Sequence, residues 1–300
     1  MNRPMSRHRP PARTPEQELD LKPGQSLGLL RALHILTREG RINQDSRRKL
    51  KQVYHLWGFV EKCLQSRLEA MGQGPGCLTV VDHGAGKSYL GFIIYDLFFK
   101  GRLDRADAPI QGQIWSIETR SELVERAQGL AHELGFTGMS FLPLSVQDAI
   151  QSPELPARID VVTALHACDT ATDDAIAFGL AKQAQFMVLV PCCQAELAAC
   201  LRQDKALALA RTPLAELWRH PLHTREVGSQ LTNVLRCLYL ESQGYRVTVT
   251  ELVGWEHSLK NELILAEYTG QRKHSARERL LALLETFGLS ALAQTRYPAQ

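Results

Sequence analysis

The stretch VVDHGAGKSYL, residues Val80 to Leu90, decides the fold of this 300-residue chain. The apolar run at 77–82 predicts a short buried strand, and the helical spacing of apolar residues at 87–99 predicts a helix. Between them, Gly84 permits a tight turn and Gly86 lets the backbone approach a ligand. Because open α/β sheets bind ligands at the carboxyl ends of their strands, we expect a binding site at this turn.

The letters Gly-Lys-Ser at the end of the stretch suggest a phosphate-binding loop, but the spacing argues against one. A Walker A loop needs a glycine at position 81, where this chain has Val81 inside the predicted strand. A dinucleotide-binding turn needs a third glycine at position 89, which is occupied by Tyr89. The turn is therefore expected to hold a ligand other than a nucleoside triphosphate or a dinucleotide.

Short apolar runs alternate with helical patterns after this turn. Strands are predicted at 77–82, 113–118, 139–145, 158–166 and 185–191 and in a terminal pair at 245–253 and 261–268. Helices are predicted at 26–36, 46–71, 87–99, 121–134, 171–183, 194–203 and 230–244. The alternation predicts an α/β fold with a doubly wound, mostly parallel sheet covered on both faces.

Composition divides the chain into four parts. We expect a disordered basic tail at 1–24, an N-terminal helical extension at 25–72, a Rossmann-like domain at 73–270 and a C-terminal helical tail at 271–300. The first boundary follows a Pro- and Arg-rich start, and the second coincides with the sequence GQGPG, residues 72–76.

Charge and cysteine content limit the partners and the compartment. The net charge is only +3, but arginines crowd the tail and a second basic cluster consists of Arg38, Arg41, Arg47, Arg48, Lys49 and Lys51. Nucleic acid is one explanation for this cluster, and a solvated helix face is the other. No apolar run is long enough to cross a membrane, and no secretory signal follows the first arginines. Seven cysteines without framework spacing indicate free thiols in a reducing compartment, with the cytoplasm as the default.

Acidic residues at strand ends indicate what the turn binds. The first N–H groups of a helix can receive a carboxylate, such as the amino-acid end of S-adenosylmethionine, and Asp82 would then oppose the ammonium and sulfonium charges of that molecule. Glu118 ends the second strand, where an acid can accept hydrogen bonds from ribose hydroxyls. Asp148, after the third strand, is placed to read an adenine amino group. A purely structural alternative for Glu118 is an acid favoured by the dipole of the following helix.

Two cysteine-bearing segments follow the fourth and fifth strands. LHACDTATDDA begins at Leu165 and contains His166, Cys168, Asp169 and Asp173; LVPCCQAEL contains Cys192, Cys193 and Gln194. A zinc site of the deaminase type is an alternative, but adjacent cysteines rarely reach one tetrahedral ion and a cysteine stands at the position of the glutamate that the signature requires, so we expect no metal. Packing of small residues at tight turns is a further alternative.

Together, the blocks DHGAGKSYL, LHACDTATDDA, VPCCQ and WEHSLKNELILAEY resemble a branch of the class I S-adenosylmethionine-dependent methyltransferases. This branch includes the domain fused to a glutathione-transferase-like module in animals, and the tRNA ribose 2′-O-methyltransferases look like more distant relatives. The resemblance covers about Arg47 to Tyr268 and implies a seven-stranded sheet whose last strand is antiparallel. The chain departs from these relatives at Ser88, where glycine is frequent, and at Gln194, where the tRNA enzymes have histidine.

The predicted function is methyl transfer from S-adenosylmethionine to an unidentified acceptor, with RNA as one candidate through the basic N-terminal helix. Cofactor contacts are expected from Asp82, Gly84, Ala85, Gly86, Glu118, Asp148 and Leu165. His166 and Asp169 are the candidate proton acceptors. Acceptor contacts are expected from Cys192, Cys193, Gln194, Arg225 and Asn261. Arg225 lies in a stretch, 211–229, that is predicted to be irregular and forms either a substrate wall or a solvated loop.

Two rival functions remain at this point. One is a non-catalytic protein with the cofactor-binding fold that binds RNA or a protein partner. The other is a zinc-dependent, deaminase-like hydrolase. Binding of S-adenosylmethionine would favour the methyltransferase over both.

Overall fold

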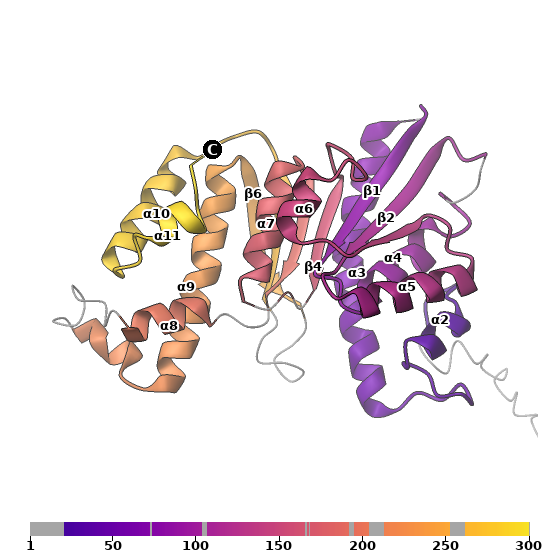
Figure 1. The fold of residues 1–300 in the computed structure, drawn as a ribbon, viewed down its shortest axis with the longest axis horizontal. Helices are drawn as coiled ribbons and strands as arrows, with labels where there is room; N and C mark the ends of the chain where they lie inside the picture. Colours follow the sequence, from indigo (N-terminus) through magenta and orange to yellow (C-terminus); the bar gives the residue numbers. More distant parts are fainter. Residues whose placement is uncertain are drawn as a thin grey trace, which may run out of the picture.

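The computed structural model describes residues 21–72, 74–103, 107–165, 167, 169–191, 195–203, 213–252 and 262–299. Seven strands form one sheet in the order β3-β2-β1-β4-β5-β7-β6 (Figure 1). Their bounds are β1 Gly76–His83, β2 Ile110–Ile117, β3 Met139–Leu142, β4 Val161–Leu165, β5 Phe186–Val190, β6 Tyr245–Glu251 and β7 Glu262–Tyr268. The first five strands pair in parallel, and β7 runs antiparallel to both β5 and β6. The predicted seven-stranded, mostly parallel sheet is confirmed.

Helices connect the strands and cover both faces of the sheet. Their bounds are α2 Leu27–Ala32, α3 Gln44–Met71, α4 Tyr89–Ile94, the π-helix η1 Tyr95–Phe99, α5 Ser121–Leu134, α6 Val146–Gln151, α7 Ala171–Ala181, α8 Glu196–Gln203, the 3₁₀-helix η3 Pro213–Trp218, α9 Pro221–Ser242, α10 His274–Thr286 and α11 Leu292–Thr295. None of the helices in the described ranges is long and apolar enough to span a bilayer.

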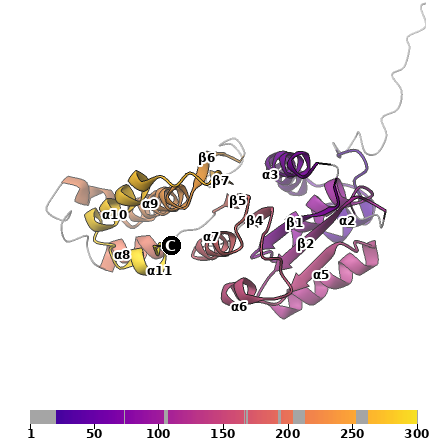
Figure 2. The same ribbon diagram turned by 90° about the horizontal axis from the view of Figure 1, so that it is seen from above.

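Alternation along the strands divides the apolar residues between two cores. Val80 belongs to a cluster that includes residues of α2, α3, α4, η1 and α5, whereas its neighbour Val81 belongs to a cluster with residues of α6 to α11. Successive side chains of a strand point to opposite faces, so each core lies on one side of the sheet. Figure 2 shows α3 and α7 on opposite sides of β4 and β5.

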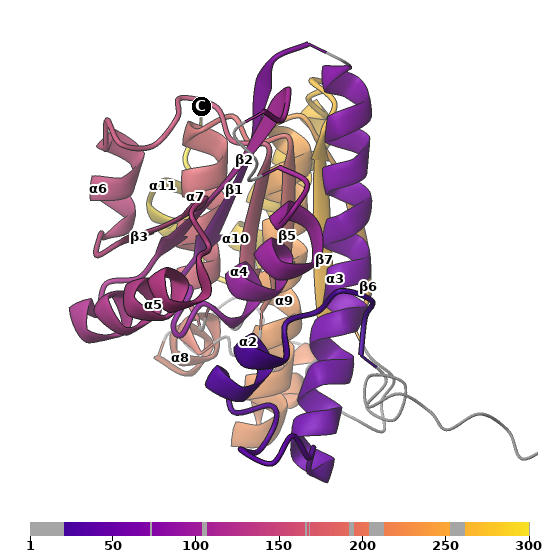
Figure 3. The ribbon, with the colours of Figure 1, turned by 90° about the vertical axis from the view of Figure 1, so that its right-hand side faces the viewer.

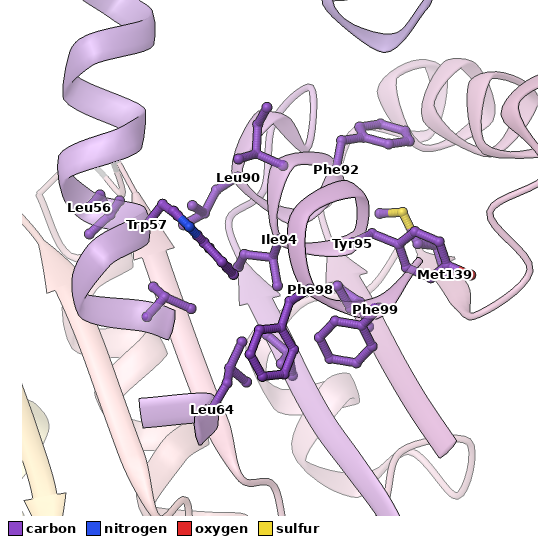
Figure 4. Close-up of a cluster of buried hydrophobic side chains, with 14 of the residues drawn as sticks. Leu56, Trp57, Leu64, Leu90, Phe92, Ile94, Tyr95, Phe98, Phe99 and Met139 are labelled. Atoms are coloured by element: carbon purple, nitrogen blue, oxygen red, sulfur yellow. The ribbon is translucent and has the colours of Figure 1, made fainter. Parts of the chain in front are cut away.

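The helix α3 is packed tightly against the helix that follows the glycine turn. Figure 4 shows Trp57 of α3 facing α4 and η1, and Trp57 meets Phe98 edge-on, with ring centroids 6.0 Å apart. Burying each such side chain contributes roughly 1.5–3 kcal/mol. At the amino end of the sheet, Asp160 accepts hydrogen bonds from the backbone and hydroxyl of Thr79 and from Arg67 of α3. Both contacts hold α3 in place along the sheet.

The beginning of α3 extends beyond the carboxyl edge of the sheet. α3 ends at Met71 and β1 begins at Gly76 after a short turn, so helix and strand run in opposite directions (Figure 3). The 28 residues of α3 span about 42 Å at a helical rise of 1.5 Å. The 8 residues of β1 span only about 26 Å. The first turns of α3 therefore lie on the same side of the molecule as the glycine turn.

Two predicted elements differ from the observed ones. The stretch 211–229 was expected to be irregular and to be followed by a helix from residue 230. In the structure, α9 already begins at Pro221. Of that stretch, residues 211 and 212 lie outside the described ranges. Proline suits the first helical position because its missing N–H needs no partner there, and the buried Thr224 hydroxyl bonds the carbonyl of Trp218. The predicted helix 87–99 is interrupted, since its second half is the π-helix η1.

The predicted tail cannot be compared, because residues 1–20 lie outside the described ones. The proposed boundaries at 72 and 270 remain predictions. Apolar contacts cross both, since Trp57 and Leu280 each belong to a core built around the sheet.

Candidate active site

The glycine turn combines three left-handed residues at alternate positions. Gly84, Gly86 and Ser88 have φ angles of +64°, +59° and +55°. Glycine adopts this conformation without steric cost, which explains its use at the first two positions. The turn is joined to β2 because the N–H of Ala85 donates to the carbonyl of Ile117 at 3.0 Å. The strand ends of β1 and β2 are thereby held together around the site.

Ser88 is the third left-handed residue of the turn. It is fully buried, and its hydroxyl lies 2.6 Å from the hydroxyl of Ser116 on β2. A β-carbon on Gly91 would lie only 2.7 Å from the Ser88 hydroxyl oxygen, so this pair needs a glycine beside it. A buried hydrogen bond thus accompanies the strained backbone at Ser88.

Glu118 follows β2 directly and faces the turn. Its carboxylate accepts hydrogen bonds from the N–H of Gly86 at 2.9 Å and from the side chain of Arg120 at 2.9 and 3.1 Å. The bonds from the Arg120 guanidinium, with those from two backbone N–H groups, lower the pKa of Glu118 to about 2. Glu118 is therefore an ionised hydrogen-bond acceptor at neutral pH.

Asp82 lies at the other side of the turn and is buried. The hydroxyl of Thr163 on β4 donates to its carboxylate at 2.8 Å. Burial raises the pKa of Asp82 to about 6, although the Thr163 bond acts in the opposite direction. A cation that binds next to Asp82 would favour its ionised form.

A cleft of about 280 Å³ opens between these residues at the carboxyl edge of the sheet. Its lining consists of Asp82, Gly84, Ala85, Gly86, Lys87, Tyr89, Leu90, Arg120 and Leu165. Five of the residues predicted to contact the cofactor therefore line one cleft, and a sixth, Glu118, bonds to Gly86 at its wall. A β-carbon on Gly84 would lie 3.9 Å from Ala167 and one on Gly86 would lie 3.9 Å from Arg120, so the backbone there borders open space.

These residues fit S-adenosylmethionine. Its ribose hydroxyls can donate hydrogen bonds to an ionised carboxylate such as that of Glu118. Its ammonium and sulfonium groups are positively charged and suit a second carboxylate, that of Asp82. Bare backbone at Gly84 and Gly86 allows close approach.

His83 was not singled out from the sequence. It lies between Asp82 and Gly84, is 6% exposed, and neither of its ring nitrogens has a hydrogen-bond partner among the described residues. Burial lowers the pKa of His83 to about 4, although the charge of Glu118 raises it. The ring, 5.8 Å from that of Phe178, is therefore neutral at pH 7. Only the position beside the motif acid could have drawn attention to it.

The turns after β4 and β5 meet at Asp169. Its carboxylate accepts hydrogen bonds from the N–H groups of Ala195 and Glu196 at 2.9 and 3.1 Å, at the beginning of α8. The backbone of Asp169 is left-handed, with φ +50°, and its carbonyl accepts from Arg236. Asp169 therefore joins the segment after β4 to the segment after β5. His166, Cys168, Cys192, Cys193, Gln194 and Asn261 lie outside the described residues.

A buried charged network supports this region and was also missed. Arg236 of α9 is completely buried and donates to both carboxylate oxygens of Asp173 at 2.9 and 2.6 Å. It also donates to Asn233, whose amide donates to Glu262 at the start of β7. The network links the segment after β4 to α9 and β7. Sequence separations of 29 and 63 residues leave no local pattern that would reveal it.

Two predicted site residues lie apart from the cleft lining. Asp148 is exposed in the first turn of α6, where its carboxylate bonds the hydroxyl of the cap residue Ser145 at 2.6 Å. Arg225 lies on α9 with its side chain 56% exposed and pairs with Glu226. Their proposed contacts with adenine and acceptor remain predictions. In the described part of the chain, no cluster of three His, Cys, Asp or Glu residues could hold a metal ion.

Comparison with known proteins identifies the family. A family model described as a methyltransferase domain matches residues 48–200, half of the chain. No curated protein sequence matches the chain.

Several solved structures are similar to it. Magnesium protoporphyrin IX methyltransferase from Synechocystis with bound S-adenosylhomocysteine is 15% identical, covers 82% of this chain and 95% of its own, and has a TM-score of 0.43. TrmK from M. capricolum, also with S-adenosylhomocysteine, is 9% identical, covers 74% of this chain and 81% of its own, and has a TM-score of 0.38. An S-adenosylmethionine-dependent methyltransferase from Aquifex aeolicus is 16% identical, covers 67% of this chain and 86% of its own, and has a TM-score of 0.35. These identities are too low to transfer a substrate.

The family match covers the turn, both carboxylates and the segments after β4 and β5. The sheet has seven strands and its last strand, β7, is antiparallel, as the resemblance to class I enzymes implied. The chain therefore belongs to this family of methyltransferase domains and is a class I methyltransferase that uses S-adenosylmethionine.

Proposed function

We propose that this protein transfers the methyl group of S-adenosylmethionine to RNA. The observation that carries the proposal is the position of exposed basic residues at the beginning of α3. Arg47, Arg48, Lys49 and Lys51 are exposed in its first turns, and Arg38 and Arg41 are exposed just before it. Because these turns extend past the carboxyl edge of the sheet, the charges lie on the side of the molecule that carries the cleft.

In the proposed complex, the residues of the cleft hold the donor. Glu118 accepts hydrogen bonds from the ribose hydroxyls, and Asp82 faces the positive charges of the methionine part. The N–H groups at the start of α4 face its carboxylate. The donor supplies an activated methyl group, and the protein positions the acceptor in line with it and excludes water.

A hydroxyl or amino acceptor needs a proton acceptor at the segment after β4. His166 and Asp169 are the proposed groups. The carboxylate of Asp169 already accepts two backbone N–H bonds at the beginning of α8. We therefore favour His166 as the base and assign Asp169 to holding the segments after β4 and β5 together.

Transfer of a labelled methyl group tests the proposal. Purified protein is incubated with labelled donor and with separated RNA, protein and small-molecule fractions of a cell extract, and the Glu118→Ala variant is the control. We expect label in the RNA fraction only, and far less with the variant. Label confined to the protein or small-molecule fraction would replace RNA by that class of acceptor.

A further inference from the structure

A second cleft adjoins the donor cleft and has no assigned ligand. It has a volume of about 250 Å³ and lies between the loop after α2, the start of α4 and the helix α5. Figures 1 and 3 both show these three elements side by side. Lys87 and Tyr89 line both clefts, so the two share a wall. A group bound in the second cleft is therefore next to the donor.

The charged side chains that line this cleft, those of Lys87 and Arg126, are both cationic. His34, Lys87 and Arg126 come from three separate segments and are exposed, and no acidic residue belongs to the lining. Within the described ranges, Lys87 and Arg126 form no ion pair with any carboxylate. By contrast, Arg120 at the donor cleft is paired with Glu118, and the buried Arg236 is paired with Asp173. Unpaired cations around a cleft are suited to an anionic ligand.

The backbone of the cleft wall is held in an unusual conformation. His34 is left-handed, with φ +56°, which is rare for a residue with a β-carbon. The hydroxyl of Tyr89 donates to the carbonyl of the preceding residue, Leu33, at 2.9 Å, and the N–H of His34 donates to Arg31. The loop is thus tied to the start of α4, and residues held in such conformations are concentrated at binding sites.

We infer that this cleft binds a phosphate group of the acceptor RNA, adjacent to the donor. The inference rests on the proposed function, because it takes the acceptor to be RNA. A guanidinium and an ammonium on different elements can donate to separate oxygens of one phosphate, and this contact would fix the strand relative to the methyl group. The beginning of α3 would contact other phosphates of the same strand.

Arg126 provides the test because it lines this cleft and not the donor cleft. The Arg126→Ala variant is compared with Arg126→Lys, which keeps the charge, and with Arg158→Ala. Arg158 is an exposed arginine that precedes β4, at the opposite edge of the sheet. Three quantities are measured: the affinity for a labelled single-stranded RNA over a series of salt concentrations, the affinity for S-adenosylhomocysteine, and the rise in melting temperature caused by sodium pyrophosphate at constant ionic strength.

We expect Arg126→Ala to weaken RNA binding about tenfold at low salt, as for loss of one charged hydrogen bond. The log–log salt slope should become shallower by roughly 0.7, the value for one phosphate of a single strand. The pyrophosphate effect should shrink, and affinity for S-adenosylhomocysteine should be unchanged. Arg126→Lys should retain most of the binding, and Arg158→Ala should behave as the wild type.

Three other results would distinguish failure of the phosphate-site inference from failure of the proposal that the acceptor is RNA. An equal loss of affinity for S-adenosylhomocysteine would place the cleft in the donor site and overturn the inference. Unchanged RNA affinity and an unchanged pyrophosphate effect in Arg126→Ala would also overturn it. If the wild type binds no RNA at low salt, yet pyrophosphate stabilises it and Arg126→Ala removes that effect, the phosphate site stands and RNA as its source is wrong.

Discussion

The carboxylate of Glu118 accepts a hydrogen bond from the backbone N–H of Gly86, 2.9 Å away, so the ends of β2 and of the glycine turn meet at one charged group. The same carboxylate accepts three bonds from Arg120, two from its side chain and one from its backbone. Glu118 thus has two partners that an incoming ribose must share or displace. Substitutions of Glu118 and of Arg120 are therefore expected to change the affinity for S-adenosylhomocysteine in opposite directions.

Glu118→Ala should weaken binding of S-adenosylhomocysteine about tenfold to a hundredfold, since hydrogen bonds to a charged group contribute roughly 1.5–3 kcal/mol. Calorimetric titration measures the affinity, and circular dichroism checks that the variant is folded. Unchanged affinity in a folded variant would exclude Glu118 as the ribose acceptor.

Arg120→Ala should instead strengthen binding of S-adenosylhomocysteine, because the guanidinium no longer competes for the carboxylate. The pKa of Glu118 should rise toward its ordinary value, since the Arg120 side chain is the main cause of its lowering. Titration of the carboxyl group by NMR and calorimetry of ligand binding measure the two effects. Weaker binding with an unshifted pKa would show that Arg120 holds the ligand directly.

Two substitutions of Ser88 distinguish the effect of backbone strain on stability from the effect of its hydrogen bond. Ser88→Ala should lower the free energy of unfolding by about 1 kcal/mol or more, because it leaves the buried Ser116 hydroxyl without this partner and keeps the left-handed strain. Ser88→Gly loses the same bond but relieves a strain of roughly 1–2 kcal/mol, so its stability should be near that of the wild type. Urea unfolding of both variants measures the difference. Equal destabilisation by Ala and Gly would show that the backbone there carries no strain.

His83 makes stability depend on pH in a specific direction. Its pKa is about 4 in the folded protein, below the ordinary histidine value of 6.5, so the unfolded chain binds the proton more readily between these values. The contribution of His83 to stability is therefore complete above pH 6.5 and declines as the pH falls toward 4. Relative to His83→Leu, the wild type should lose roughly 2 kcal/mol between pH 7.5 and 5.

Urea unfolding of wild type and His83→Leu at both pH values measures this difference. Subtracting the two removes the opposite contribution of Asp82, whose raised pKa of about 6 favours the folded state at lower pH. Parallel curves for the two proteins would contradict the buried, neutral state of His83.

The exposed charges of α3 predict the salt dependence of RNA binding. Replacing Arg47, Arg48 and Lys49 together by alanine should reduce the log–log slope by roughly 0.7 for each lost phosphate contact, with little dependence on RNA sequence. Affinity for S-adenosylhomocysteine should be unaffected, since α3 contributes no residue to the lining of the donor cleft. If the wild type shows no measurable RNA binding at low salt, the proposal of an RNA acceptor is wrong.

The sequence by itself determined the features that depend on neighbouring residues. Glycines at 84 and 86 are required by backbone angles that other residues adopt at a cost, and alternation of apolar runs with helical patterns suffices to predict a parallel sheet. Glu118 could be placed at the edge because a strand pattern ends beside it. Five residues predicted to contact the cofactor accordingly line one cleft.

Only the tertiary structure decided which groups meet across the sheet. Three features depend on how β1, β2 and α7 pack: the pairing of Glu118 with both Gly86 and Arg120, the bond between Ser88 and Ser116, and the burial of His83 with no hydrogen-bond partner in the described part of the chain. Arg236 and Asp173 are 63 residues apart. The helix α9 begins earlier than its apolar pattern, with Pro221 in its first turn and the buried Thr224 hydroxyl bonded to the carbonyl of Trp218. Periodicity reports which face of an element is apolar, but the partner of a buried polar group is set by strand order and helix packing, which have no local signature.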